Sequence, residues 1–354
     1  MRRGLPHRAA WLIPCVVAGV ILGGIPPRAW GGEEAREWLE KMNVALSTRN
    51  YDGTFFHLSE GRVETMRNVH RVRAGRITER LSSLDGSGRE FVRNDDELTC
   101  YLPDQHLVLV EARHNASLLG SLPKFGSDLE ASYRLEARSS ARVLGRAARV
   151  IVVNPKDEYR FGYRLWLDEK TAMPLKTQLC DARGQVIEQI LFARLDMPDS
   201  IADAELLPAV RTEGMRWVRQ GASGDPLPPA LSGYRVSRLP PGFHLTVTGT
   251  QTLGGAEVPA THLVYSDGLA TVSVFVEAPS ESGAEASQPP KPAQGGMPPR
   301  GMAVEGLARF GSGFAFSTVV QGHQVTAVGE VPAQTVEFIA HSVKSDGGKP
   351  LPAH

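Results

Sequence analysis

Arginines are the residues of this 354-residue chain whose type and spacing most clearly suggest chemistry. Eight of them fall within 32 residues, at Arg62, Arg67, Arg71, Arg73, Arg76, Arg80, Arg89 and Arg93. Alternation along a strand would put Arg67, Arg71 and Arg73 on one face, where guanidinium groups can bind phosphates or an acidic peptide. The alternative is that the cluster pairs on a solvated face with the acids nearby, which are Glu60, Glu64, Glu79 and Glu90. Arg67, Arg71 and Arg73 are therefore candidates for binding an anionic group.

An apolar strand face is the second feature that suits the binding of a ligand. Residues 159–168 alternate, and one face carries Tyr159, Phe161, Tyr163, Leu165 and Leu167. Such a face suits a cavity for an acyl chain, but it equally suits an ordinary hydrophobic core. Together with Phe55 from an earlier strand, these five residues are the candidates for lining a lipid cavity.

Motifs for catalysis are missing. The sequence has no H-E-x-x-H, C-x-x-C, Walker loop, G-x-S-x-G or strand-associated G-x-G-x-x-G. Its histidines are scattered singly, and Asp95-Asp96-Glu97 lacks the spaced oxygen ligands of a calcium site. We expect no enzymatic activity, no cofactor and no metal.

The elements that must position these residues are mostly strands. Residues 33–48 form an amphipathic stripe typical of a helix. The period then changes to two, and the pattern predicts an antiparallel meander over 51–111. A helical or irregular interlude over 116–136 precedes further strands at 143–153, 159–168, 174–180 and 185–195.

A second and smaller unit follows the first. The periodicity fades over 196–231, and six strand patterns and a helix at 332–343 come after it. We therefore expect an N-terminal domain at 33–200, a linker at 201–231 and a C-terminal domain at 232–345 with a disordered, Pro-rich insertion at 279–302. The fold class is α+β and mainly β, with a large curved antiparallel sheet, covering helices and a smaller α+β C-terminal domain.

The N-terminus has the pattern of a secretory signal peptide at residues 1–29. Arginines precede an apolar run that Pro14 and several glycines interrupt, so it is too broken to span a membrane. Without these residues the chain has 35 basic and 39 acidic side chains, a net charge of −4, which argues against a nucleic-acid binder. We expect an exported protein of the bacterial periplasm.

Two cysteines, Cys100 and Cys180, remain after removal of the signal peptide. An oxidising compartment permits a disulfide between them, provided that their strands lie close together. The alternative is two buried thiols that act as small hydrophobic side chains.

Short motifs spread in order along the chain resemble the RseB/MucB family of periplasmic regulators of the envelope-stress sigma factor. The first group is Asp52-Gly53-Thr54-Phe55, Glu64-Thr65-Met66-Arg67, Val69-His70-Arg71-Val72, Glu79-Arg80-Leu81 and Thr99-Cys100-Tyr101-Leu102-Pro103-Asp104. The second group is Tyr163-Arg164-Leu165-Trp166-Leu167-Asp168, Pro174-Leu175, Leu239-Pro240-Pro241-Gly242-Phe243, Val264-Tyr265-Ser266-Asp267-Gly268-Leu269-Ala270 and Val328-Gly329-Glu330-Val331-Pro332. The resemblance covers essentially the whole chain after the signal peptide.

The resemblance implies a regulator that binds the periplasmic segment of a transmembrane anti-sigma factor of the RseA or MucA type and shields it from regulated proteolysis. It also implies an N-terminal domain like the lipoprotein carriers, a half barrel around an apolar cavity, and a lipid or lipopolysaccharide ligand that relieves the inhibition. Self-association is a further expectation. A pure lipid or lipoprotein carrier is the alternative function, and it gives the second domain no evident role.

Overall fold

The computed structural model describes residues 30–94, 97–112, 125–126, 129–220, 233–251, 259–277 and 305–345. The predicted signal peptide, the Asp95-Asp96 pair and the Pro-rich insertion therefore lie outside the described residues. From Gly31 onward the chain belongs to one compact unit. In the part that the structure describes, no helix is long and apolar enough to cross a membrane.

Helix α1 (Trp30–Thr48) covers the predicted amphipathic stripe. Its buried side chains, Ala35, Leu39, Met42 and Ala45, follow one another at the three- and four-residue spacing of one helical face. They pack in one core with buried strand residues, among them Tyr51 and Leu165. Packing of this face, rather than helix propensity, is what holds a helix of this length.

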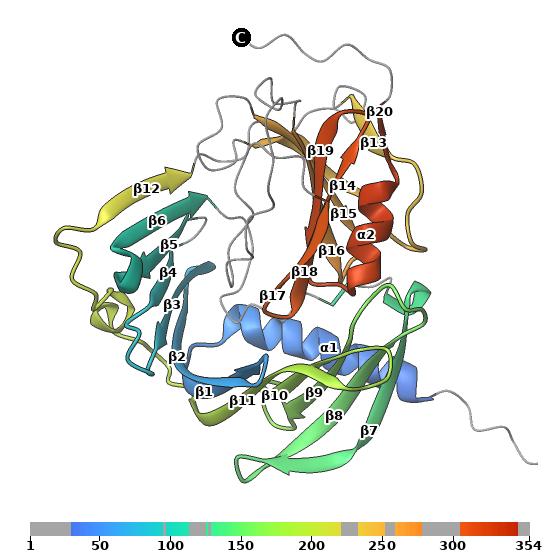
Figure 1. The fold of residues 1–354 in the computed structure, drawn as a ribbon. Helices are drawn as coiled ribbons and strands as arrows, with labels where there is room; N and C mark the ends of the chain where they lie inside the picture. Colours follow the sequence, from blue (N-terminus) through green and yellow to red (C-terminus); the bar gives the residue numbers. More distant parts are fainter. Residues whose placement is uncertain are drawn as a thin grey trace, which may run out of the picture. The chain divides into compact units, whose positions relative to one another are not determined.

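A twelve-stranded open sheet is the larger of the two main sheets among the described residues. Its strands are β1 (Tyr51–Ser59), β2 (Arg62–Arg73), β3 (Arg76–Ser83), β4 (Glu90–Asn94), β5 (Glu97–Leu102), β6 (Leu107–Ala112), β7 (Tyr133–Val143), β8 (Arg146–Pro155), β9 (Gly162–Asp168), β10 (Pro174–Cys180), β11 (Val186–Asp196) and β12 (Arg216–Gln220). Their order is β12-β6-β5-β4-β3-β2-β1-β11-β10-β9-β8-β7, so β1 joins the two meanders by pairing with β11 (Figure 1). All neighbours are antiparallel except β12 and β6. Short 3₁₀ turns are η1 (Pro103–Gln105), η2 (Leu129–Ala131) and η3 (Asp203–Leu206).

Strands β7 and β12 differ from the sequence expectation. Strand β7 begins inside the predicted interlude, and only its residues Tyr133 and Leu135 are buried, because it is an edge strand with little apolar signal. Strand β12 lies in the predicted linker, where η3 also packs. Its parallel pairing with β6 needs a long crossover, which no local pattern reveals.

The second sheet has six strands and one helix. The strands are β14 (His244–Gln251), β15 (Ala260–Ser266), β16 (Thr271–Glu277), β17 (Gly306–Phe310), β18 (Gly313–Val320) and β19 (His323–Gly329), in the order β14-β15-β16-β19-β18-β17. Helix α2 (Ala333–His341) packs Val336 and Ile339 against Val274 and Ala327. A separate two-stranded ladder joins β13 (Tyr234–Val236) to β20 (Val343–Ser345). The mainly-β, α+β fold class predicted from the sequence is thus confirmed.

Gly53 shows why one of the quoted motifs requires a glycine. A Cβ atom at this position would lie 2.4 Å from Cε1 of Phe192 and 3.2 Å from Cδ1 of Leu195. Phe192 is buried and packs its ring against Phe55, with ring centroids 5.5 Å apart. The inner face of β1 therefore has no room for a side chain beside Phe192.

We predict that Gly53→Ala lowers the free energy of unfolding by about 1–3 kcal/mol, the usual cost of overpacking a core. Urea unfolding measures this as a lower midpoint with an unchanged slope. Gly306→Ala is the matched control, because it also lies in a strand but a Cβ there meets nothing within 4 Å. Equal stability of the two variants would contradict the packing account.

Candidate functional site

A fully buried arginine lies where the two sheets meet. Arg160, just before β9, has no exposed surface. Its Nε donates to Oδ1 of Asp157 at 2.9 Å and its Nη2 donates to Oδ2 of the same carboxylate at 3.0 Å. The guanidinium also donates to Oδ2 of Asp267 and to the carbonyl oxygen of Pro241, both of which belong to the part of the chain that builds the second sheet. One side chain thus bonds both parts of the molecule.

Aromatic rings and a tyrosine hydroxyl complete the surroundings of Arg160. The guanidinium carbon lies 5.6 Å from the ring centroid of Tyr133 and 5.1 Å from that of Phe243. The Tyr133 hydroxyl donates to Oδ2 of Asp267 at 3.1 Å, and burial raises the pKa of this tyrosine. Cation–π contacts are strongest where the cation is desolvated, as it is here.

The turn motifs of the second sheet shape this site. Oδ1 of Asp267 accepts the backbone N–H groups of Leu269 at 2.9 Å and Ala270 at 2.7 Å, so the carboxylate caps its own turn while Oδ2 binds Arg160. Gly242 has φ +81°, and a Cβ there would lie 2.4 Å from Oγ of Ser132. The motifs containing Gly242 and Asp267 therefore converge on Arg160. We name Arg160, Asp157, Asp267, Tyr133 and Phe243 the Arg160 junction.

Tyr159 corrects one sequence expectation. It lies before β9 begins, so it is not part of the strand face that carries Leu165 and Leu167. Its carbonyl oxygen accepts the Thr335 hydroxyl of α2 at 2.8 Å, and its ring packs against Phe338 at 5.7 Å between centroids. The alternation fails because the chain turns at Arg160 to reach the Arg160 junction.

A cluster of titratable side chains lies near this contact. Nε2 of His57 in β1 is 3.1 Å from Oε1 of Glu188 in β11, and this hydrogen bond raises the pKa of His57. After β19, Glu330 accepts the Ser312 hydroxyl. Burial raises the pKa of Glu330 to about 7, the Ser312 bond opposes this, and the charge of Glu188 adds to the increase.

Two of the three predicted anion-binding arginines, Arg67 and Arg71, bind carboxylates of the chain itself. Arg67 donates to both oxygens of Asp52, at 2.9 and 2.8 Å, and to Oε2 of Glu205 at 2.8 Å. Arg71 donates to Asp203, and it lowers the pKa of that carboxyl with a smaller contribution from the exposed Arg73. Asp203 and Glu205 belong to η3, more than a hundred residues along the chain. The binding of an external anion by Arg67, Arg71 and Arg73 stays a prediction.

The ion-pairing alternative describes the rest of the cluster. Arg80 pairs with Glu90, Arg89 with Glu64 and Arg93 with Glu79. Sequence reasoning named these acids but not the partners of Arg67 and Arg71, because nothing local indicates that η3 folds back over β2 and β3.

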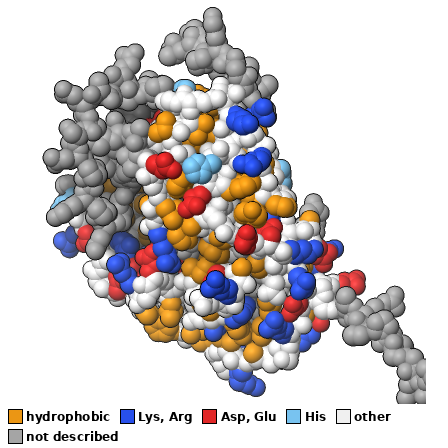
Figure 2. All heavy atoms as spheres, turned by 45° about the vertical axis from the view of Figure 1, so that its right-hand side comes forward, with side chains coloured by type: hydrophobic (Ala, Val, Ile, Leu, Met, Phe, Trp, Pro, Cys, Tyr) orange, Lys and Arg blue, Asp and Glu red, His pale blue; other side chains and the backbone are white. Residues whose placement is uncertain are grey.

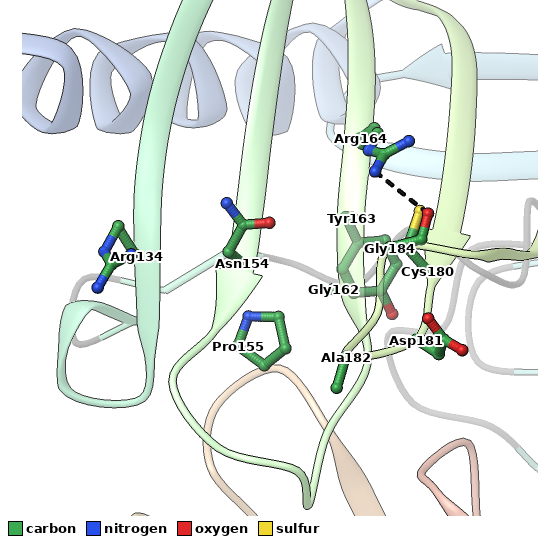
Figure 3. Close-up of a pocket in the computed structure, with 10 residues that line it drawn as sticks. All are labelled: Arg134, Asn154, Pro155, Gly162, Tyr163, Arg164, Cys180, Asp181, Ala182 and Gly184. Carbon is green, nitrogen blue, oxygen red and sulfur yellow. Dashed lines mark hydrogen bonds between the residues drawn. The ribbon is translucent and has the colours of Figure 1, made fainter.

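The lipid-cavity candidates are mostly core residues in this structure. Phe55, Phe161, Tyr163, Leu165 and Leu167 are all buried in the core that includes α1. A small cavity of about 60 Å³ borders this core, between Leu39 of α1, Phe125 and Leu135 of β7. A shallow pocket of about 160 Å³ lies at the ends of β7 to β10 and is lined partly by Tyr163 (Figure 3). Lipid binding by these residues stays a prediction.

Cys100 and Cys180 form no disulfide with each other. Strands β5 and β10 are separated by five intervening strands, at about 4.8 Å per step, so the two thiols are far beyond bonding distance. Both side chains are buried. Among the described residues, no group of three His, Cys, Asp or Glu side chains could hold a metal ion.

Comparison with known proteins assigns the family. The model of the MucB/RseB N-terminal domain matches residues 34–210, and that of the MucB/RseB C-terminal domain matches residues 228–344. This chain belongs to the MucB/RseB family. The resemblance seen in the motifs is confirmed.

Members of the MucB/RseB family that resemble this chain are named as sigma-factor regulatory proteins. The sigma factor AlgU regulatory protein MucB of Pseudomonas aeruginosa is 31% identical, over 88% of this chain and 92% of its own length. The sigma-E factor regulatory protein RseB of Salmonella typhimurium is 26% identical, over 86% of this chain and 89% of its own length. The solved complex of Pseudomonas aeruginosa MucA and MucB matches with a TM-score of 0.66 and 30% identity, over 89% of this chain and all of the matched chain. The family consists of regulatory proteins rather than enzymes, and this chain is one of them.

The Arg160 junction was missed by sequence reasoning. Alternation over 159–168 places Arg160 on the amphipathic face opposite Phe161 and Tyr163, and its partners Asp267 and Pro241 are 107 and 81 residues away. The available signal was indirect, because two of the motifs that define the MucB/RseB resemblance contain these partners. A buried ion pair between motifs is visible only once the chain is folded.

We predict that Arg160→Lys lowers the free energy of unfolding by about 3–5 kcal/mol, because it breaks a buried charge network and leaves Asp157 without its forked partner. Urea unfolding measures the change. Arg142→Lys is the matched control: Arg142 is exposed, and its substitution should change stability by no more than about 0.5 kcal/mol. A loss below about 1 kcal/mol for Arg160→Lys would contradict the role given to the Arg160 junction.

We also predict that Glu330 makes stability fall as pH rises from about 5 to about 7, against the opposite effect of His262, whose pKa burial lowers. The folded protein binds a proton on Glu330 more tightly than the unfolded chain does, so ionisation of this carboxyl costs stability, and His57 acts in the same direction because its pKa is also raised. Glu330→Gln should flatten this slope and stabilise the protein by about 2 kcal/mol at pH 8. Glu169→Gln is the control, since Glu169 also binds a serine hydroxyl but is exposed. An unchanged slope in Glu330→Gln would contradict this prediction.

Proposed function

We propose that this chain binds the periplasmic segment of a transmembrane anti-sigma factor of the MucA type and protects it from regulated proteolysis. The observation that carries the proposal is the match to the MucA/MucB complex, which extends over 89% of this chain and includes both sheets. A protein that only carried lipid would need one apolar cavity and no second sheet. The export pattern of residues 1–29 supports a periplasmic location for this activity.

The Arg160 junction supports a protective role that uses both sheets together. A segment bound to one part of the molecule can be shielded by the other part only if the two parts keep their relative positions during binding. The buried Arg160–Asp267 pair opposes separation, because opening it would expose both charges and break the hydrogen bonds from Arg160 to Asp267 and Pro241. Preorganisation of this kind favours affinity, because less conformational entropy is lost on binding.

We further propose that a lipid releases the segment. The support is the apolar inner face of the large sheet, with Leu165 and Leu167 under α1 and a small cavity beside Leu39. Burial of an acyl chain gains about 0.8 kcal/mol per methylene. The lipid must bind better to the released state than to the segment-bound state, since equal affinity for both would shift nothing. A cavity of about 60 Å³ is too small for a chain, so α1 or its neighbours must move when lipid enters.

A lipid or lipoprotein carrier remains the alternative function. It shares the apolar face and the curved sheet with the regulator. It differs in predicting transfer of lipid between membranes, with no effect on the cleavage of any anti-sigma segment. The two functions are therefore separated by a proteolysis assay.

The test is digestion of the purified periplasmic segment by its regulated protease, with and without the mature chain. We predict at least tenfold slower cleavage at saturating protein, and recovery of the rate when lipopolysaccharide is added. Bovine serum albumin controls for crowding, and an unrelated substrate controls for inhibition of the protease. Equal cleavage with and without the chain would contradict the regulator function, whereas protection that lipid fails to relieve would contradict only the release mechanism.

A further inference from the structure

A band of apolar side chains crosses the outer face of the large sheet, opposite α1. Strand register places Phe56 beside Leu191, Leu191 beside Lys176, Lys176 beside Trp166, and Trp166 beside Val150. We name these five residues the outer band. They occupy one line across β1, β11, β10, β9 and β8.

The outer band is accessible to solvent, whereas the inner face of the same strands is not. Phe56 is 38% exposed, and the other four members are half-buried. Their neighbours on the inner face, including Phe55, Ile190 and Ile151, are buried in the core with α1. On the face drawn in Figure 2, hydrophobic side chains lie among charged ones. Apolar side chains that adjoin one another at the surface, as the strand register places the outer band, mark an interaction site.

Lys176 gives the outer band a cation at its centre. Its Nζ lies 4.4 Å from the ring centroid of Trp166, and its partial burial lowers its pKa. A tryptophan beside a lysine is the combination enriched where proteins meet the headgroup region of a bilayer. The stem of the lysine adds apolar area while its amine faces outward.

Two arginines extend the positive charge beside the outer band. Arg164 precedes Trp166 by two residues on the same face of β9, and Arg134 faces the same side from edge strand β7. Between them lies a notch lined by Gly162, whose backbone lies so close to β8 that a Cβ there would be 2.7 Å from the carbonyl oxygen of Val153. This notch is the pocket of about 160 Å³ in Figure 3, with Arg134 and Arg164 on opposite sides.

Neither Arg134, Arg164 nor Lys176 forms an ion pair with a carboxylate among the described residues. The nearby carboxylate of Asp181 is occupied by the backbone N–H groups of Arg183 and Gln185. Arg67 and Arg71, by contrast, form ion pairs with acids of η3. The outer face of β8 to β11 thus presents aromatic and aliphatic groups together with cations that form no ion pair among the described residues.

We propose that this outer face docks on an anionic phospholipid surface, with the outer band at the headgroup boundary and Lys176, Arg164 and Arg134 toward the phosphates. Interfacial binding needs both components, an apolar face of modest area and cations for anionic lipids. This surface is distinct from the inner-face cavity, so the proposal does not depend on lipid acting as the releasing ligand.

Charge argues against a second copy of the chain as the occupant. A symmetric dimer would place the outer band of one protomer on that of its partner. Lys176 and Arg164, which form no ion pair among the described residues, would then approach the same cations of the other copy. An anionic lipid surface matches the same face without this repulsion.

The test is flotation of the mature chain with vesicles of phosphatidylglycerol and phosphatidylethanolamine, compared with vesicles of phosphatidylcholine alone. We expect binding to the anionic vesicles that weakens in high salt. The Arg164→Gln/Lys176→Gln double variant should bind roughly 25-fold more weakly, since each cation contributes about fivefold. Phe56→Ser should bind roughly tenfold more weakly. Thermal unfolding confirms that each variant is folded.

Matched controls come from β12 at the opposite edge of the sheet. Trp217 is 56% exposed, and the Arg219 side chain is 70% exposed. Trp217→Ser and Arg219→Gln should leave vesicle binding within twofold of the unmodified chain. Equal binding by all variants would overturn the proposal, because it would show that the outer face is not used.

Three other results would also overturn it. One is a change in sedimentation of the outer-band variants without vesicles, which would identify a second copy as the occupant. Another is release by inorganic phosphate at constant ionic strength, which would identify a site for the free anion. The third is recovery of the protein as a soluble complex carrying lipid, which would assign the binding to the inner cavity. Loss of protection in the proteolysis assay has no bearing on these outcomes, so the two proposals fail separately.

Discussion

The burial of Arg160 is the constraint on which the rest of this structure depends. Removing a guanidinium from water costs several kcal/mol, and the cost is met only when its donors are bonded and its charge is balanced. Arg160 makes four hydrogen bonds, two to Asp157 on its own side and two to Asp267 and Pro241 on the other. The side chain is therefore satisfied only when both sheets are in place. This requirement explains the glycine at 242, which admits Ser132, and the tight turn that Asp267 caps.

Charged side chains elsewhere in the molecule either pair with one another or stay available to bind other molecules. The arginine-rich meander bonds to acids of its own chain, including two from η3, and this fixes η3 over β2 and β3. The outer face of β8 to β11 keeps Arg164 and Lys176 without such partners. The lipid proposed for the inner cavity and the membrane surface proposed for the outer face would therefore meet different parts of one MucB/RseB-type molecule. Internal pairing separates structural arginines from those free to bind other molecules.

The sequence was sufficient for the elements whose patterns are local. Helix α1, strand β10 and the alternation of Leu165 and Leu167 follow from periodicity, because burial of one face imposes it. Edge strand β7 was missed because few of its residues are buried, and β12 because its partner β6 is about a hundred residues away. The distant partners of Arg67, Arg71 and Arg160 could not be predicted for the same reason. Ion pairs form between segments that the fold brings together, and a local pattern of residue types does not show which distant segments meet.

A double-mutant cycle on Arg160 and Asp267 tests the central claim, that one buried ion pair joins the two sheets. The free energy of unfolding would be measured by urea titration for the unmodified chain, Arg160→Met, Asp267→Asn and the double variant. The account predicts that each single change is strongly destabilising and that the double change costs less than their sum by at least about 2 kcal/mol, since the second removes a charge already left unpaired. Additive losses, within about 0.5 kcal/mol, would show that the two residues contribute independently and would contradict the account.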